Sequence, residues 1–137
     1  MATFKVNGID YVVKDWEKAA QESPELCRRM LESGAQEAVN ILRRHIETAK
    51  LLDTKKMRDS VKPTKIKEEM GGYSCEVYPQ GKDKKGVRNA EKAFVNNYGT
   101  TGKRKVPATH FFERATEEMA QAVPDAMERV FHQETGG

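Results

Sequence analysis

The most constraining feature of the sequence is a long amphipathic segment between Ser23 and Ala49. Ser23-Pro24-Glu25 supplies a capping hydroxyl, a proline where a missing N–H costs no hydrogen bond, and an acid in the first turn. Apolar residues then recur with a period close to that of a helix, and charged residues occupy the other faces. A helix of about 25 residues is therefore predicted. Its apolar positions are Leu26, Met30 or Leu31, Ala35, Ala38 or Val39, Leu42, Ile46 and Ala49.

A short N-terminal segment alternates apolar and polar residues. Residues 4–11 surround Asn7-Gly8, and Asn-Gly is the dipeptide that most readily supplies the backbone angles of a tight hairpin turn. A strand up to Val6, followed by a partner strand, is predicted on this basis. Residues 9–20 also fit the start of a helix, so the partner strand and a helix both remain open. The positions that would share the helix face are Ile9, Val12, Val13, Trp16 and Ala19 or Ala20.

A second hairpin is predicted after the long helix. Residues 61–70 and 73–78 flank Gly71-Gly72, and the second of these segments alternates apolar and polar residues. Pro63 has no backbone N–H to donate to a sheet. The first strand is therefore either an edge strand or begins after residue 63.

Two further helices are predicted in the C-terminal part of the chain. A short helix runs from Asn89, as its cap, to Asn97, and Gly99 ends it because glycine readily adopts a left-handed conformation. One face of this helix is expected to carry Ala90, Ala93, Phe94 and Asn97 or Tyr98. The last helix begins near Thr109, and Pro124 interrupts or restarts it. Its apolar stripe consists of Phe112, Ala115 or Thr116, Met119, Ala122 or Val123, Ala126, Met127, Val130 and Phe131.

The remaining segments are predicted to be loops. Residues 79–88 and 100–106 are rich in turn formers and charge without periodicity, which is typical of flexible loops, and residues 133–137 are expected to fray. We therefore expect an α+β fold in which helices cover one face of a small antiparallel sheet. The length of 137 residues and the hydrophobic fraction of 37% fit one domain, residues 1–137.

The composition also bears on location and partners. No segment approaches about 18 consecutive apolar residues, and the N-terminus lacks the apolar core of a secretory signal, so a cytoplasmic protein without membrane contact is expected. The net charge of +3 is unevenly distributed: residues 54–67 contain six Lys or Arg against one acid, and residues 82–105 contain eight against two. This asymmetry predicts a bipolar surface, suited to head-to-tail stacking of subunits or to a polyanion on one side.

No residue pattern indicates catalysis, a cofactor or a metal site. The cysteines have no second Cys or His at ligand spacing, no histidine stands in a catalytic motif, and adjacent glutamates point in different directions in a strand or a helix. We therefore expect a protein that is not an enzyme. The residues concerned are Cys27, Cys75, His45, His110, His132, Glu68, Glu69, Glu117 and Glu118.

The most recognisable motif lies between residues 93 and 115. Phe94-Val95 leads to Tyr98-Gly99-Thr100, a variable loop, Pro107-Ala108-Thr109-His110-Phe111-Phe112 and Arg114-Ala115. In order and spacing this block resembles the neck proteins of long-tailed bacteriophages, the gene-product-ten type of morphogenesis or minor tail proteins. Residues 7–10 and 54–61 resemble two further steps of that family. Two departures are Lys55, which replaces a usual glycine, and Asn97, which replaces an acid common before the aromatic-Gly-Thr.

The resemblance implies a structural subunit of the head–tail junction, which completes the tail end or joins it to the head connector. The implied partners are a connector or head-completion protein, a tail tube or terminator protein, and further copies of the chain in a ring. Such a subunit would assemble in the host cytoplasm and then reside in the neck or tail of a phage or prophage virion.

The two basic loops are the predicted contact sites. They are expected to become ordered against neighbouring subunits, ring partners or DNA in the lumen. A small DNA-binding module that uses the same loops is an alternative function, and an unrecognised small enzyme or toxin is a second alternative. The candidate interface residues are Lys82, Lys84, Lys85, Arg88, Tyr98, Thr100, Thr101, Lys103, Arg104 and Lys105.

Overall fold

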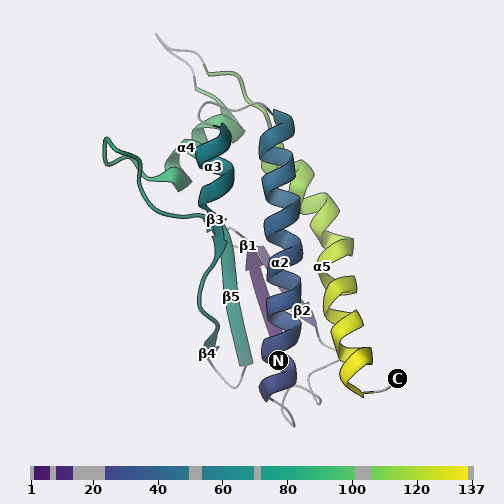
Figure 1. Ribbon diagram of the computed structural model, residues 1–137. Coiled ribbons are helices and arrows are strands. Elements are labelled where there is room, and N and C mark those ends of the chain that lie inside the picture. Colours follow the sequence, from purple (N-terminus) through teal and green to yellow (C-terminus); the bar gives the residue numbers. More distant parts are fainter. Residues whose placement is uncertain are drawn as a thin grey trace.

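The computed structural model describes residues 2–6, 9–13, 24–49, 54–69, 72–100 and 106–135 (Figure 1). Two long helices lie side by side against a sheet, and two short helices lie at one end of the molecule (Figure 1). The helices are α2 (Pro24–Ala49), α3 (Thr54–Ser60), α4 (Asn89–Tyr98) and α5 (Phe111–Thr135). The strands are β1 (Ala2–Val6), β2 (Ile9–Val13), β3 (Val61–Pro63), β4 (Lys67–Glu69) and β5 (Gly72–Pro79). The predicted α+β fold is confirmed.

The described strands form one sheet in the order β2-β1-β5-β3, and β4 also pairs with β5. Three of the pairings, β1–β2, β3–β5 and β4–β5, are antiparallel as predicted, whereas β1 runs parallel to β5 with Phe4 opposite Cys75. The strand pairing of residues 9–13 decides between the two N-terminal alternatives in favour of a hairpin. Residues 14–20 of the alternative helix lie outside the described residues.

The sheet edge formed by β3 and β4 is interrupted between them. Pro63 is the last residue of β3 at this edge, which agrees with the predicted edge position. Thr64 bridges the interruption: its N–H donates to the carbonyl of Glu76 at 2.7 Å, and its hydroxyl accepts the Glu76 N–H at 2.9 Å. The segment from β3 to β4 therefore stays hydrogen-bonded to β5 across the interruption, although only β3 and β4 are regular strands.

The core lies between α2, α5 and the sheet. The buried residues of α2 include the predicted stripe from Leu26 to Ile46, together with Cys27, Gly34 and Ile41, whereas Ala49 is only partly buried. The buried residues of α5 include Ala115, Met119, Val123 and Met127. Gly34 lets the two helices approach closely, because a Cβ at this position would lie 3.0 Å from Cγ of Met127. α5 continues through Pro124 without interruption, so the predicted break at this proline is wrong. The frayed tail stays a prediction, since α5 is helical to Thr135 and residues 136–137 are outside the described residues.

The short helix α3 was not predicted. It is positioned by Met57, which is buried in the core, and by ion pairs that join Arg58 to Glu47 on α2 and to Asp59. Ser60 closes it by donating its hydroxyl to the Met57 carbonyl at 2.7 Å. Within the described ranges, no helix is long and apolar enough to cross a membrane.

Candidate functional site

The helix α4 buries its small and polar residues and exposes its aromatic ones. Ala93, Asn96 and Asn97 are buried, whereas Phe94 is 64% exposed and Tyr98 is 54% exposed. The predicted shared face of the helix is therefore buried at Ala93 and Asn97 and exposed at the two rings. The two rings contact each other across one helical turn at an interplanar angle of 51°, with their centroids 4.7 Å apart.

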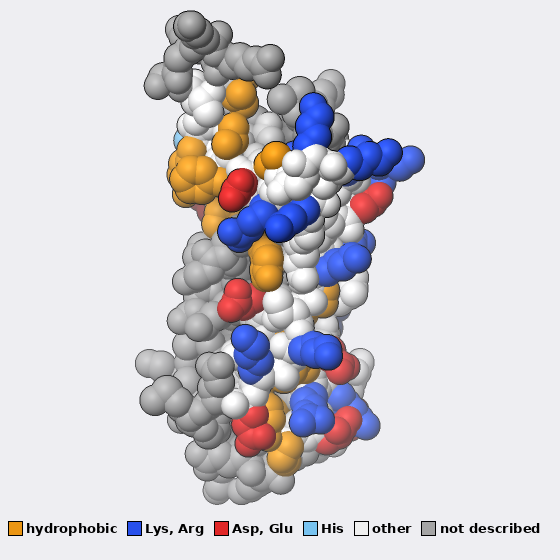
Figure 2. Space-filling view, turned by 90° about the vertical axis from the view of Figure 1, so that its left-hand side faces the viewer, with side chains coloured by type: hydrophobic (Ala, Val, Ile, Leu, Met, Phe, Trp, Pro, Cys, Tyr) orange, Lys and Arg blue, Asp and Glu red, His pale blue; other side chains and the backbone are white. Residues whose placement is uncertain are grey.

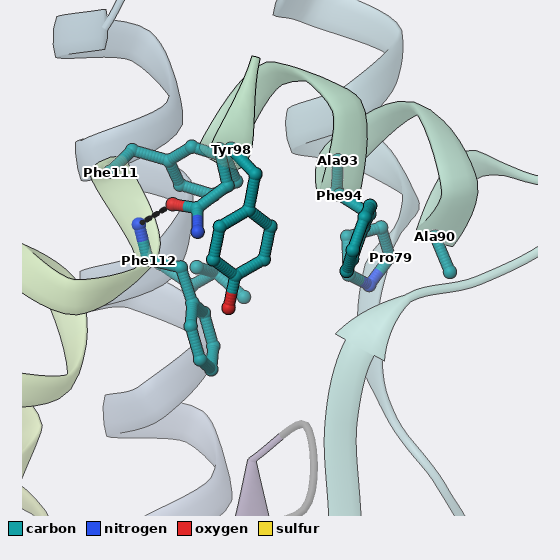
Figure 3. Close-up of a pocket in the computed structure, with 9 residues that line it drawn as sticks. Pro79, Ala90, Ala93, Phe94, Tyr98, Phe111 and Phe112 are labelled. Carbon is teal, nitrogen blue, oxygen red and sulfur yellow. Dashed lines mark hydrogen bonds between the residues drawn. The ribbon is translucent and has the colours of Figure 1, made fainter. Parts of the chain in front are cut away.

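The aromatic side of α4 borders an open groove of about 270 Å³ (Figure 3). In this groove Tyr98 lies between Phe94 and Phe112, and Phe94 faces Pro79 at the end of β5 (Figure 3). We call it the aromatic groove. It is lined by Leu42, Pro79, Ala90, Ala93, Phe94, Asn97, Tyr98, Phe111 and Phe112.

Two buried asparagines hold α4 against the start of α5. The side-chain oxygen of Asn97 accepts the backbone N–H of Phe112 at 3.0 Å, and its amide nitrogen donates to a carboxylate oxygen of Glu113 at 2.9 Å. The carbonyl of Asn96 accepts both the N–H and the hydroxyl of Thr109, at 3.0 and 2.8 Å. Asn97 thus satisfies one of the N–H groups that the first turn of a helix leaves without an intrahelical partner.

The carboxylate of Glu113 responds to this arrangement. Partial burial acts to raise its pKa, but the hydrogen bond from Asn97 and the neighbouring His110 outweigh that effect, so the pKa lies below its usual value. An acid at position 97, which is common in the family that the chain resembles, would place two carboxylates together here. Asn97 avoids this repulsion while retaining the bond to the α5 backbone.

The loop between α4 and α5 is pinched at its base. Gly99 ends α4 with a φ of 77°, and a Cβ there would lie 2.7 Å from the Val106 carbonyl, so the predicted glycine stop is confirmed. The Thr100 N–H donates to the same carbonyl at 2.9 Å. Thr100 is exposed at this base. The predicted contact residues Thr101, Lys103, Arg104 and Lys105 lie outside the described residues.

The loop between β5 and α4 is organised around Asp83. Its carboxylate accepts the N–H groups of Lys85 and Val87, both at 2.9 Å, and pairs with the ammonium of Lys92 at 2.5 Å. The Lys92 ammonium and these backbone bonds lower the pKa of Asp83 from 3.8 to about 2. The flexibility of this loop stays a prediction, but its backbone has defined internal partners.

Asn89 does not cap α4. Arg88 holds the cap position without a side-chain hydrogen bond, which corrects the predicted cap. The side chain of Asn89 instead donates to the Gln80 carbonyl at 2.8 Å, and its backbone N–H donates to the Gly81 carbonyl at 3.0 Å. The residue therefore closes the base of the loop, where the two ends of residues 80–89 meet.

The basic residues of this loop point to solvent. Lys82, Lys84, Lys85 and Arg88 are all exposed, and Val87 between them is 40% exposed. Figure 2 shows hydrophobic side chains gathered on the upper part of this face, with Lys and Arg side chains beside them. We call Lys82, Lys84, Lys85 and Arg88 the basic rim. Four predicted contact residues thus lie on one loop, and Tyr98 lines the aromatic groove beside Phe94, which was not among the predicted contact residues.

The groups capable of acid–base or metal chemistry are engaged elsewhere. Each histidine pairs with a glutamate, and in the described part of the chain no three His, Cys, Asp or Glu side chains converge as metal ligands. Cys27 and Cys75 are buried, and burial raises the pKa of both thiols, for Cys75 to about 11. The histidine pairs are His45–Glu118, His110–Glu113 and His132–Glu128.

Comparison with known protein families identifies the family of the chain. Residues 12–99 match the family model HK97-gp10-like, described as "Bacteriophage HK97-gp10, putative tail-component". The match includes the long helix, β3 to β5, the basic rim and α4, and it ends at Gly99, before the Pro107–Ala115 part of the motif. No curated protein and no solved structure matches the chain. The chain belongs to the HK97-gp10-like family of bacteriophage tail components.

Proposed function

We propose that the protein is a structural, non-enzymatic subunit of the head–tail junction, where it completes the tail end or joins it to the head connector. Membership in the tail-component family supports a structural role in the virion. The observation that carries the proposal is the contrast between a rigid core of α2 and α5 and an exposed aromatic groove with a basic rim. Large exposed apolar patches on small soluble proteins mark contact sites for other macromolecules.

The charge distribution supports assembly between neighbouring subunits. α5 carries six acids against two arginines, whereas the basic rim lies at the end of the molecule that holds α4. A bipolar subunit can contact the next copy head to tail, and such heterologous contacts close into rings when the rotation between copies permits. The other partners would be a connector or head-completion protein and a tail tube or terminator protein. Assembly would take place in the host cytoplasm.

Electron microscopy of particles made without the protein tests this function. A phage whose gene for this chain is deleted should produce DNA-filled heads and separate tails, and supply of the protein should restore joined particles. Joined and infectious particles from the deletion strain would contradict the proposed role.

The alternative function, a DNA-binding module, is supported by the exposure of the basic rim. Reversal of the charges at Lys84 and Lys85, together with Lys103, Arg104 and Lys105, separates the two functions. A loss of salt-dependent retention on DNA with normal assembly would favour the DNA-binding module. Normal DNA behaviour with full heads and detached tails would favour the junction role.

A further inference from the structure

We propose that the aromatic groove receives large apolar side chains from a segment of a different virion protein, and that this segment carries acidic residues that face the basic rim. The inference rests on the proposed structural role and names the chemistry of one of its partners. It is derived from the size of the groove, the polarity of its lining, the charge of its rim and the lack of a matching surface among the described residues of a second copy.

The size and lining of the groove favour side chains over a cofactor or metabolite. Its volume of about 270 Å³ lies below the range of about 300–1,000 Å³ typical of small-molecule sites. Aromatic, proline and alanine side chains form most of its surface, and the Asn97 amide already bonds to Phe112 and Glu113. Such a site offers few directional bonds to a polar ligand. It has room for one or two apolar side chains of a partner.

The exposed rings of Phe94 and Tyr98 lie on a helix that is fixed to its neighbours. The tilted rings of Phe94 and Tyr98 contact each other on the solvent side of α4, and hydrogen bonds of Asn96 and Asn97 fix the backbone beneath them. Aromatic residues bury a large area on binding, and side chains that are already restrained lose less freedom when a partner arrives. A partner that covers these rings would therefore gain much of its binding free energy from this helix.

The basic rim determines the charge of the partner. Asp83 is the acid of this loop, and it is turned inward onto Lys92 and the backbone, so the outward side chains are four cations. The loop starts after Pro79 and ends before Ala90, and both of these residues line the groove. An apolar segment that lies in the groove beside Pro79 and Ala90 is therefore next to the basic rim. Acidic residues beside its apolar side chains would pair with the rim, whereas basic ones would be repelled.

The described part of a second copy does not supply this chemistry. Among the described residues, the large exposed hydrophobics are Val87, Phe94 and Tyr98, and all three belong to this site. A two-fold contact between two grooves would bring two basic rims together. The outer surface of α5 offers acidic residues but none of the large exposed hydrophobics. A different protein of the virion is the occupant that fits both the groove and its rim.

Two synthetic helical peptides test this chemistry on the full chain. Both carry the same face of leucine and phenylalanine, one with flanking glutamates and the other with flanking lysines. The glutamate peptide should bind, more weakly as salt rises, and should shift amide NMR signals of α4, the start of α5 and residues 80–88. The lysine peptide should bind at least about tenfold more weakly. Equal affinities, absence of binding by both peptides, or signal shifts elsewhere would overturn the proposal.

Variants of the protein distinguish binding in the aromatic groove from non-specific binding of the peptide. The double substitution Phe94→Ala and Tyr98→Ala should lower the affinity for the glutamate peptide by at least about tenfold. Lys84→Glu with Lys85→Glu should lower it by about tenfold, while the matched control Lys62→Glu with Lys65→Glu, on the exposed edge of the sheet, should lower it by less than about threefold. Equal effects of the two charge pairs would contradict a role for the rim.

Two further measurements test whether a second copy of the chain or DNA occupies the groove instead. Any self-association of the unmodified chain in sedimentation should persist in the Phe94→Ala, Tyr98→Ala variant. Self-association that these substitutions abolish would identify a second copy as the occupant. A DNA duplex should not displace the glutamate peptide at moderate salt. Displacement accompanied by signal shifts of the groove residues would identify DNA instead.

Complementation of a deletion phage distinguishes failure of this inference from failure of the proposed function. The Phe94→Ala, Tyr98→Ala protein should fold, yet should restore the titre of joined particles at least about tenfold less well than the unmodified protein. Full complementation by this variant would overturn the docking site and leave the junction role standing. Normal particles from the deletion itself would overturn the junction role.

Discussion

The helices α2 and α4 differ in what they bury. α2 buries large apolar residues such as Met30, Leu31 and Ile41, and its charged residues are exposed or half-buried. α4 does the reverse, because Ala93 and two asparagines are buried while Phe94 and Tyr98 are exposed. The difference shows that α4 is positioned by hydrogen bonds to its neighbours, which leaves its apolar residues available for a partner. α2 holds the fold together, and α4 presents a surface.

The largest effect on stability is expected where α5 packs against α2. Met119 is fully buried, and its replacement by alanine removes buried methylene and sulfur contacts and leaves a cavity. We expect Met119→Ala to lower the free energy of unfolding by about 2–5 kcal/mol, measured by urea denaturation. Met119→Leu preserves the volume and should cost less than about 1.5 kcal/mol. A small effect of Met119→Ala would show that the helix interface is not the main source of stability.

A smaller effect is expected for the polar attachment of α4. Asn97→Ala removes two hydrogen bonds, to the Phe112 backbone and to Glu113, and leaves a buried N–H without its acceptor. The free energy of unfolding should fall by about 1–3 kcal/mol. The control Asn40→Ala, on the exposed face of α2, should change it by less than about 0.5 kcal/mol. Equal effects of the two substitutions would refute the role of Asn97 in holding α4.

A local effect is expected for the loop that carries the basic rim. The folded state lowers the pKa of Asp83 from 3.8 to about 2, so its bonds stabilise the folded protein above the unfolded-state pKa and are lost as the pH falls through about 2. The stability difference between the unmodified protein and Asp83→Asn should therefore shrink as the pH falls from about 4 towards about 2. A constant difference over this interval would contradict the Asp83–Lys92 contact.

The same substitution should loosen the loop at neutral pH. Lys84 and Lys85 are exposed trypsin sites, and Asp83 restrains the backbone around them through two N–H groups. Cleavage after these lysines should be faster in Asp83→Asn than in the unmodified protein, whereas cleavage after the exposed Lys65 should be unchanged.

The smallest effect on stability is expected for the exposed rings. Phe94 is 64% exposed, so Phe94→Ala removes few contacts within the chain and should change the free energy of unfolding by less than about 1 kcal/mol. Measured in the same denaturation experiment as Met119→Ala, Phe94→Ala compares an exposed residue of α4 with a buried residue of the α2–α5 interface. A loss as large as that of Met119→Ala would show that Phe94 belongs to the core after all.

The sequence predicted the elements whose signal is local. The apolar period of α2 runs through Leu26, Ala35 and Ile46, and the proline and acid at its start define where it begins. Gly99 also carries a local signal, since only its backbone freedom permits the turn after α4. The helix α3 left no such signal. It has one buried apolar residue, Met57, and its ion pair with α2 depends on a residue eleven positions away.

The candidate site could be predicted only in part, for a similar reason. Helical spacing shows which residues of α4 share a face, but not which face the rest of the protein covers. Asn97 is buried because Phe112 and Glu113 lie against it, and that contact forms only in the folded chain. The sequence did indicate the cations of the basic rim as contact residues, because they stand in a segment with turn formers and charge, and it also indicated Tyr98, which lies just before the second basic loop. Their contact role stays a prediction.

The parallel pairing of β1 with β5 has a consequence for the order of folding. β1 lies inside the sheet between β2 and β5, yet Ala2 pairs with Tyr73, about 70 residues further along the chain. At synthesis rates of about 5–20 residues per second, the N-terminal hairpin must wait on the order of ten seconds before its partner strand leaves the ribosome. During that interval the inner edge of β1 is unpaired and open to incorrect strand partners. Maturation of the protein should therefore depend on chaperones and translation speed more than its size suggests.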